Sequence, residues 1–236
     1  MADMIEPCRH APVIAIDGPS GVGKGSVSAA LAAALGWQLL DSGAVYRALA
    51  LAAADRGIGA DESAKLVALA ADVDLAFQTQ HGGIGVVIDG VSVDDRLRGE
   101  AVSQMASKVA SIPEVRQALL ALQRSFRQPP GLIADGRDMG TVVFPDAQVK
   151  IFLTASPEER AQRRYKQLKE KGEDVILARL LSDIAERDRR DRERAVSPTI
   201  PAGDATVIDS TSMPLSEVVE QALALVEAKG IRPVAE

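Results

Sequence analysis

The sequence predicts an α/β fold in which helices cover both faces of a central parallel sheet. Two observations carry this prediction. Short, largely apolar runs recur along the chain, as expected of parallel strands that are buried on both faces. Each run is followed by a longer segment of helical character, and this alternation is typical of a doubly covered parallel sheet. We expect one domain that spans 11–230.

The individual elements follow from apolar runs, helix-forming stretches and glycine or proline boundaries. Asp41 or Ser42 can cap the second helix, and Pro113 suits the first turn of a later one. In chain order we predict a strand at 13–16, helices from about 24 to 35, 42–56, 62–71, 99–110 and 113–127, strands at 131–135 and 149–153, charged helices within 157–194 that are broken near Gly172, a strand at 205–208 and a helix at 215–228.

The pattern changes between about 73 and 93. Short apolar runs alternate there with the glycine pair 82–83 and with Gly90. Short runs separated by glycine turns predict antiparallel strands. The chain therefore carries a small antiparallel β insertion within its α/β fold.

Composition excludes several classes of protein. The net charge of −6 argues against a general nucleic-acid binder, which needs a basic face. One cysteine and two histidines exclude an internal disulfide, a thiolate cluster and a histidine-rich metal site. No apolar run approaches membrane-spanning length, and the first residues lack the pattern of a signal peptide. We expect a cytoplasmic protein with neither a membrane nor a nucleic-acid partner.

Positive charge is concentrated in one segment. Residues 160–194 hold 12 of the 27 Lys and Arg residues and 8 of the 33 Asp and Glu residues, a local balance of +4. The rest of the chain is acidic. A basic segment on an acidic body suits a small anionic ligand better than a polyanion.

Residues 18–26, with the sequence GPSGVGKGS, fit the pattern G-x-x-x-x-G-K directly after a strand and before a helix. In such a P-loop, backbone N–H groups and the helix N-terminus surround the phosphates of a nucleotide. Lys24 can then reach the β- and γ-phosphates. The predicted nucleoside triphosphate-binding residues are Gly18, Pro19, Ser20, Gly21, Val22, Gly23, Lys24, Gly25 and Ser26.

The same loop implies Mg²⁺ bound with the nucleoside triphosphate. Gly25 stands where most P-loops have Ser or Thr, so Ser26 must supply the hydroxyl that faces the metal. Asp135, at the end of the predicted strand 131–135, can orient water molecules on Mg²⁺.

Nucleotide binding alone leaves several functions open. A guanine-reading N-K-x-D segment is excluded because the chain contains no asparagine, and D-x-x-G is absent as well. A nucleic-acid motor is disfavoured, since the chain is acidic and has only seven aromatic residues for bases to stack on. A kinase acting on a small molecule is therefore favoured. Arginines that could clamp an anionic acceptor are Arg47, Arg116, Arg137, Arg187 and Arg194.

Four long motifs carry a family resemblance. The runs GPSGVGKGS, LLDSGAVYR, IADGRDMGTVVFPDA and ERDRRDRERAVSP resemble those of the bacterial cytidylate kinases, a group of nucleoside monophosphate kinases. The resemblance spans about residues 12–228. It implies a P-loop fold with a monophosphate-binding region at 41–130, which includes the β insertion, and a lid with arginine-rich helices at 157–194.

The resemblance also implies residue roles. Lys24, Arg137, Arg163 and Arg187 would be catalytic. Among the lid arginines Arg160, Arg163 and Arg164, we expect Arg163 to be exposed and to contact ATP. Ser42, Tyr46 and Arg47 would face the nucleoside monophosphate, Ser107, Arg116 and Asp138 would read the cytosine, Arg137 would hold the acceptor phosphate, and Arg187, Asp191 and Arg194 would contact the sugar and phosphate region.

The expected activity is the ATP-dependent conversion of CMP and dCMP to CDP and dCDP by a monomer. A related kinase acting on UMP or AMP is the alternative in the same class. A non-catalytic, ATP-binding P-loop regulatory protein is the alternative in a different class.

Overall fold

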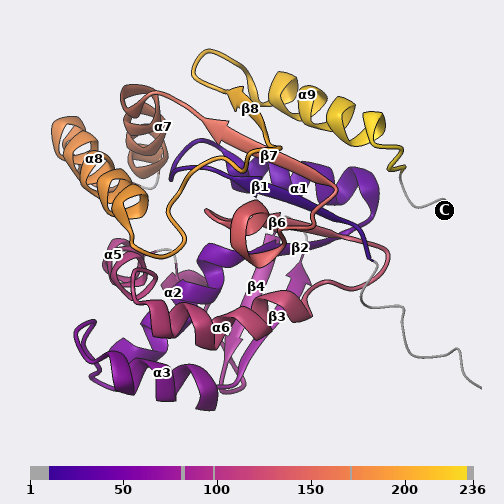
Figure 1. Ribbon diagram of the computed structural model, residues 1–236. Helices are drawn as coiled ribbons and strands as arrows, with labels where there is room; N and C mark the ends of the chain where they lie inside the picture. Colours follow the sequence, from indigo (N-terminus) through magenta and orange to yellow (C-terminus); the bar gives the residue numbers. More distant parts are fainter. Residues whose placement is uncertain (1–10, 81–82, 98, 171, 233–236) are drawn as a thin grey trace, which may run out of the picture.

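The computed structural model describes residues 11–80, 83–97, 99–170 and 172–232 (Figure 1). Its elements are β1 (Val13–Asp17), α1 (Lys24–Leu35), β2 (Gln38–Asp41), α2 (Ser42–Asp55), α3 (Ser63–Asp72), β3 (Leu75–Gln80), β4 (Gly83–Ile88), β5 (Val91–Ser92), α4 (Asp94–Leu97), α5 (Glu100–Val109), α6 (Pro113–Ser125), β6 (Leu132–Asp135), the π-helical turn η1 (Met139–Val143), β7 (Val149–Thr154), α7 (Pro157–Glu170), α8 (Leu177–Glu193), β8 (Thr206–Asp209) and α9 (Leu215–Ala228).

The central sheet is parallel, with strand order β2-β6-β1-β7-β8. In this register Asp135 pairs with Ile16 of β1 on one side and with Asp41 of β2 on the other. The carboxyl ends of β1, β2 and β6 therefore lie at one edge of the sheet. In open α/β sheets this edge faces the ligand crevice.

Both faces of the sheet are buried. Ile14 and Ile16 lie in a core shared with α1 and α9, whereas Val13 and Ala15 lie in a second core shared with α2, α3, α5 and α6. In Figure 1, α9 lies above the sheet and α3 and α6 lie below it. Complete burial of an Ile or Leu side chain contributes about 1.5–3 kcal/mol to the stability of the fold. Because successive side chains of β1 point into opposite cores, this strand stabilises the helical layers on both faces of the sheet. The predicted α/β class with a doubly covered parallel sheet is confirmed.

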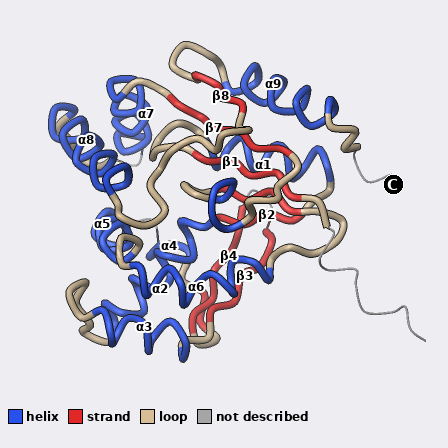
Figure 2. The backbone as a smooth tube through the Cα atoms, in the orientation of Figure 1, coloured by secondary structure: helices blue, strands red, loops and turns tan. Residues whose placement is uncertain are grey.

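The β insertion is also confirmed. β3 and β4 pair antiparallel, and β4 pairs antiparallel with β5, beside α2 (Figure 2). Val86 and Ile88 point into the core that contains α2, which fixes the insertion to the rest of the chain. Gly90 makes the predicted turn with a φ of +80°. In the other predicted turn, Gly82 lies outside the described residues.

Three short elements were not predicted. β2 has only two apolar residues, Leu39 and Leu40, between polar ends, and α4 and η1 are single turns of four and five residues. The predicted break between the charged helices is confirmed, since α7 ends at Glu170, Gly172 has a φ of +78° and α8 begins at Leu177. Within the described part of the chain, every helix is too short or too polar to cross a membrane.

Candidate active site

The P-loop connects the end of β1 to the start of α1. At Gly18 a Cβ atom would lie 2.1 Å from the carbonyl oxygen of Leu153, so no other residue fits there. Gly23 caps α1 in the left-handed region, with a φ of +97°. The loop therefore turns tightly enough to direct the first amides of α1 toward a bound anion.

Lys24 lies inside this loop with only 6% of its surface exposed. Its Nζ donates a hydrogen bond of 2.8 Å to the carbonyl of Pro19 and lies 4.0 Å from Oδ1 of Asp135. Burial and the nearby Arg137 guanidinium lower the pKa of Lys24 to about 7. A buried cation beside a second cation is stabilised by an anion, as the phosphates of a nucleotide would provide.

The chain's own oxygen donors fit Mg²⁺. Asp135 is buried at the end of β6, and its Oδ2 lies 3.7 Å from the position that a Cβ of Gly25 would take. Ser26 follows in the exposed first turn of α1. Burial raises the pKa of Asp135 to about 6, although Lys24 opposes the shift. The described residues contain no cluster of three or more acidic, His or Cys side chains, which suits a metal that keeps several waters and binds mainly through nucleotide phosphates.

Arginines from three separate segments converge opposite the P-loop. Arg47 of α2 donates a 2.7 Å hydrogen bond to Asp41, and Arg137 follows β6. Arg187 of α8 has a buried Nε without a hydrogen-bond partner among the described residues. Burial and the Arg137 guanidinium lower the pKa of Arg187 to about 10. These guanidiniums repel one another, and a bound phosphate would relieve that repulsion.

A buried cluster of polar side chains adjoins the arginines. Arg116 of α6 donates hydrogen bonds to the carboxylate of Asp138 and, at 3.1 Å, to the carbonyl of Ala110. Its guanidinium carbon lies 5.4 Å from the ring centre of Tyr46. The Ser107 hydroxyl of α5 accepts a 2.9 Å hydrogen bond from Arg190 of α8. The structure thus brings together the residues predicted to read a base.

Asp191 and Arg194 link this polar cluster to the arginines. Asp191 is 5% exposed and accepts a 3.2 Å hydrogen bond from Nε of Arg137. Burial would raise its pKa, but Arg137, Arg194 and Arg187 outweigh that effect and hold the pKa below its usual range. Arg194 donates to the carbonyls of Asp191 and Ala110 and to the Thr199 hydroxyl, each at 3.3 Å.

The lid arginines differ in their contacts. Arg160 is 3% exposed and joins Asp188 of α8 to the Ser20 carbonyl of the P-loop. Arg163 donates 2.6 Å and 3.3 Å hydrogen bonds to the carbonyls of Ser210 and Val22, and only 28% of its side chain is exposed. The prediction that Arg163 is an exposed residue is therefore wrong, because the turn after β8 covers it.

Comparison with known proteins identifies the family of this site. A family model described as cytidylate kinase matches residues 14–228. The chain belongs to the cytidylate kinase family. Among similar proteins, the cytidylate kinase of Aeromonas salmonicida is 60% identical, with 93% of this chain and 95% of the relative covered. The cytidylate kinases of Yersinia enterocolitica (58% identical, 91% and 93% covered) and Shewanella loihica (55%, 94% and 96%) are comparable. The predicted resemblance, and with it the class of nucleoside monophosphate kinase, is confirmed.

Sequence reasoning missed three polar residues of this cytidylate kinase site. Gln123 is 1% exposed, and its Oε1 accepts a 2.8 Å hydrogen bond from the Ser42 hydroxyl. It lies two helical turns after Arg116 on α6, a spacing that could have placed both on one face. Arg190 donates to the Ser107 hydroxyl and also pairs with Glu186 of the same helix. The third residue, Asp17, is buried at the end of β1.

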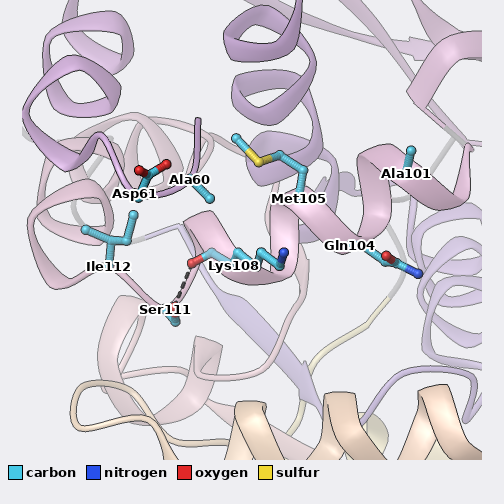
Figure 3. Close-up of a pocket in the computed structure, with 8 residues that line it drawn as sticks. All are labelled: Ala60, Asp61, Ala101, Gln104, Met105, Lys108, Ser111 and Ile112. Carbon is cyan, nitrogen blue, oxygen red and sulfur yellow. Dashed lines mark hydrogen bonds between the residues drawn. The ribbon is translucent and has the colours of Figure 1, made fainter. Parts of the chain in front are cut away.

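One cavity lies away from these residues. It measures about 600 Å³ and lies between α5 and the loop before α3 (Figure 3). Ser111 hydrogen-bonds to the carbonyl of Lys108 at its rim, and Lys108 is the one basic side chain in its lining. None of the predicted site residues lines it. A smaller cavity of about 260 Å³ touches Pro19 and Asp191 and so adjoins the P-loop.

Proposed function

We propose that this cytidylate kinase transfers the γ-phosphoryl group of ATP to CMP and dCMP, which yields ADP with CDP or dCDP. The buried pair of Arg116 and Asp138 carries the choice of base. Cytosine presents an amino donor at N4 and an acceptor at N3, whereas uracil presents a carbonyl and an N–H. A carboxylate accepts from the amino group and an arginine donates to N3, so the pair complements cytosine.

Phosphoryl transfer requires positioning and charge neutralisation more than covalent chemistry by the protein. We assign Lys24 and the P-loop amides to the donor phosphates and Arg137, with Arg187, to the acceptor phosphate and the transferring group. No general base is required, because the phosphate of CMP is already ionised. Mg²⁺, when held by the Ser26 hydroxyl and by waters on Asp135, would neutralise charge on the β- and γ-phosphates.

The remaining assignments concern the acceptor-binding region and the lid. Region 41–130 binds the acceptor through Ser42, Tyr46, Arg47, Ser107 and Arg116, and Asp191 and Arg194 contact its sugar and phosphate region. Helices α7 and α8, within 157–194, form a lid in which Arg163 faces ATP. Lid closure excludes water, which would otherwise hydrolyse ATP. A monomeric state and a cytoplasmic location stay predictions.

An ADP-release assay tests the function against its alternatives. CMP and dCMP should support turnover with kcat/KM values at least a hundredfold above those for UMP and AMP, as expected of a site that hydrogen-bonds its base. Faster turnover with UMP or AMP would overturn the base assignment. The absence of ADP release with every acceptor would favour a regulatory ATP-binding protein.

A further inference from the structure

Asp17 connects the two halves of the active site. It is the last residue of β1, directly before the first glycine of the P-loop, and is 5% exposed. Its Oδ1 accepts a 2.8 Å hydrogen bond from the backbone N–H of Met139, and its Oδ2 accepts a 2.8 Å bond from that of Gly140. These two amides follow Arg137 and Asp138 directly in the chain.

The two amides lie at the start of the π-helical turn η1. In this turn Val143 N–H donates to the carbonyl of Asp138, and Phe144 N–H donates to that of Met139. The first N–H groups of a helical turn have no acceptor within the turn itself. Asp17 supplies both acceptors from a strand 122 residues away in the chain. Two bonds to one carboxylate fix both the position and the direction of the turn.

Gly140 allows the backbone of the turn to approach the Asp17 carboxylate closely. A Cβ atom at Gly140 would lie 3.4 Å from Oδ2 of Asp17 and 3.1 Å from the Lys150 side chain, so the backbone sits directly against the carboxylate. Any outward movement of the turn would break the bonds to Asp17. It would also move Arg137 and Asp138, because both lie immediately before the anchored amides.

We propose that Asp17 is a positioning residue for the acceptor: it holds the turn that presents Arg137 and Asp138 and fixes that turn relative to the P-loop. This inference rests on the proposed function. It implies that the carboxylate of Asp17 fixes the position of the base-reading loop relative to the P-loop. Displacement by about 1 Å between reacting groups can cost on the order of a hundredfold in rate.

The decisive variant is Asp17→Asn. The carboxamide keeps the shape but has one acceptor oxygen, and its NH₂ group would face the second backbone N–H. We expect KM for CMP to rise on the order of tenfold, and the ratio of kcat/KM for CMP to that for UMP to fall on the order of fivefold or more. KM for ATP should change less than KM for CMP, because the substitution removes no P-loop residue and alters the donor side only through the weaker charge interaction between Asp17 and Lys24.

Lys150→Met is the matched control. The Lys150 Nζ donates a 2.7 Å hydrogen bond to the carbonyl of Pro145 and pairs with Asp204, so it holds the far end of the same segment. Methionine keeps the aliphatic stem against Gly140. This variant should lower the Tm while leaving KM for CMP and the CMP/UMP ratio within about twofold of wild type.

The possible outcomes distinguish a failure of the positioning role of Asp17 from a failure of the proposed function. An Asp17→Asn enzyme that loses Tm but keeps the wild-type KM and CMP/UMP ratio overturns the positioning role. A wild-type enzyme without preference for CMP overturns the proposed function instead. If Asp17→Asn is not recovered folded, hydrogen exchange of the nucleotide-free wild type decides. The amides of Met139 and Gly140 should then be strongly protected, and exchange at the rate of an open loop would refute the anchoring.

Discussion

The proposed donor and acceptor sides of the active site are built in different ways. The proposed donor side is one continuous strand–turn–helix segment that contains the P-loop, residues 18–26. The acceptor side is assembled from α2, α5, α6, the loop after β6 and α8. A local segment forms wherever its strand and helix form, whereas an assembled pocket depends on the alignment of distant elements. We therefore expect some substitutions to change KM for CMP without changing KM for ATP.

Lys24→Met should cause the largest loss and so tests the donor side alone. The substitution keeps the length of the side chain and removes the charge that reaches the β- and γ-phosphates, so kcat should fall by roughly a thousandfold or more. The Tm should not fall, because burial already disfavours the charged form of Lys24. Steady-state kinetics and calorimetry measure both effects. A nearly normal kcat would contradict the P-loop assignment.

Asp138→Ala tests the acceptor side, and its effect should depend on the base. The loss of one charged hydrogen bond at a buried site costs about 1.5–3 kcal/mol, which is about one to two powers of ten in kcat/KM for CMP. UMP should lose much less, because the carboxylate repels its carbonyl. The measurement is kcat/KM for both nucleotides with wild type and variant. An equal loss for both would mean that Asp138 positions the loop and does not read the base.

The same contrast explains what the sequence could predict. The strand–turn–helix geometry of the P-loop could be predicted from the sequence, because its glycines and Lys24 are contiguous and follow a strand; its binding of phosphate stays a prediction. The acceptor residues were named through family resemblance, since no local pattern places Arg116 beside Asp138. Gln123 and Asp17 were missed because their partners lie 81 and 122 residues away. Only the tertiary fold creates those contacts.

The error at Arg163 has a related cause. In a helix as polar as α7, the sequence pattern predicts a solvated face. The cover comes from the turn that contains Ser210, 47 residues further along the chain. β2 and η1 were not predicted for a different reason, since β2 has only two apolar residues between polar ends and η1 is a single π-helical turn.

Arg163→Ala should produce a smaller, mixed effect. Loss of the bonds to Ser210 and Val22 should lower the Tm by about 2–4 °C, as expected for about 1 kcal/mol in a chain of this size. It should also lower kcat by roughly tenfold, because Arg163 braces the P-loop from the lid. Thermal melts and kcat should be measured with Arg164→Ala as the control.

Arg164 suits that role because it makes a longer, 3.4 Å contact with the exposed Glu100. Its substitution should change the Tm by less than about 1 °C. If both variants leave the Tm unchanged, the contacts of Arg163 do not contribute to stability. If Arg163→Ala lowers the Tm and leaves kcat intact, the residue acts in folding alone.

The smallest expected effect is a proton taken up when ATP binds. The pKa of Lys24 is about 7 in the free protein, below the pKa of the unfolded chain, since burial and Arg137 disfavour its charge. Between these two values the unfolded chain binds the extra proton, so the stability of the free protein rises with pH across that window. Bound phosphates reverse the preference and favour the charged form.

Calorimetric titrations with MgATP in two buffers of different ionisation enthalpy measure this proton. At pH 8 the free Lys24 is mostly neutral, so binding should take up most of one proton per ATP, and the uptake should fall as the pH is lowered toward 6. Asp135 and Asp17, whose pKa values burial raises to about 6 and about 7, are mostly ionised at pH 8 and add little. CMP binding should take up almost none, because the acceptor side relies on arginines, of which even Arg187 stays charged at that pH. Equal uptake by both nucleotides would show that the two sides do not differ in this way, and uptake that survives in Lys24→Met would assign the proton to another group.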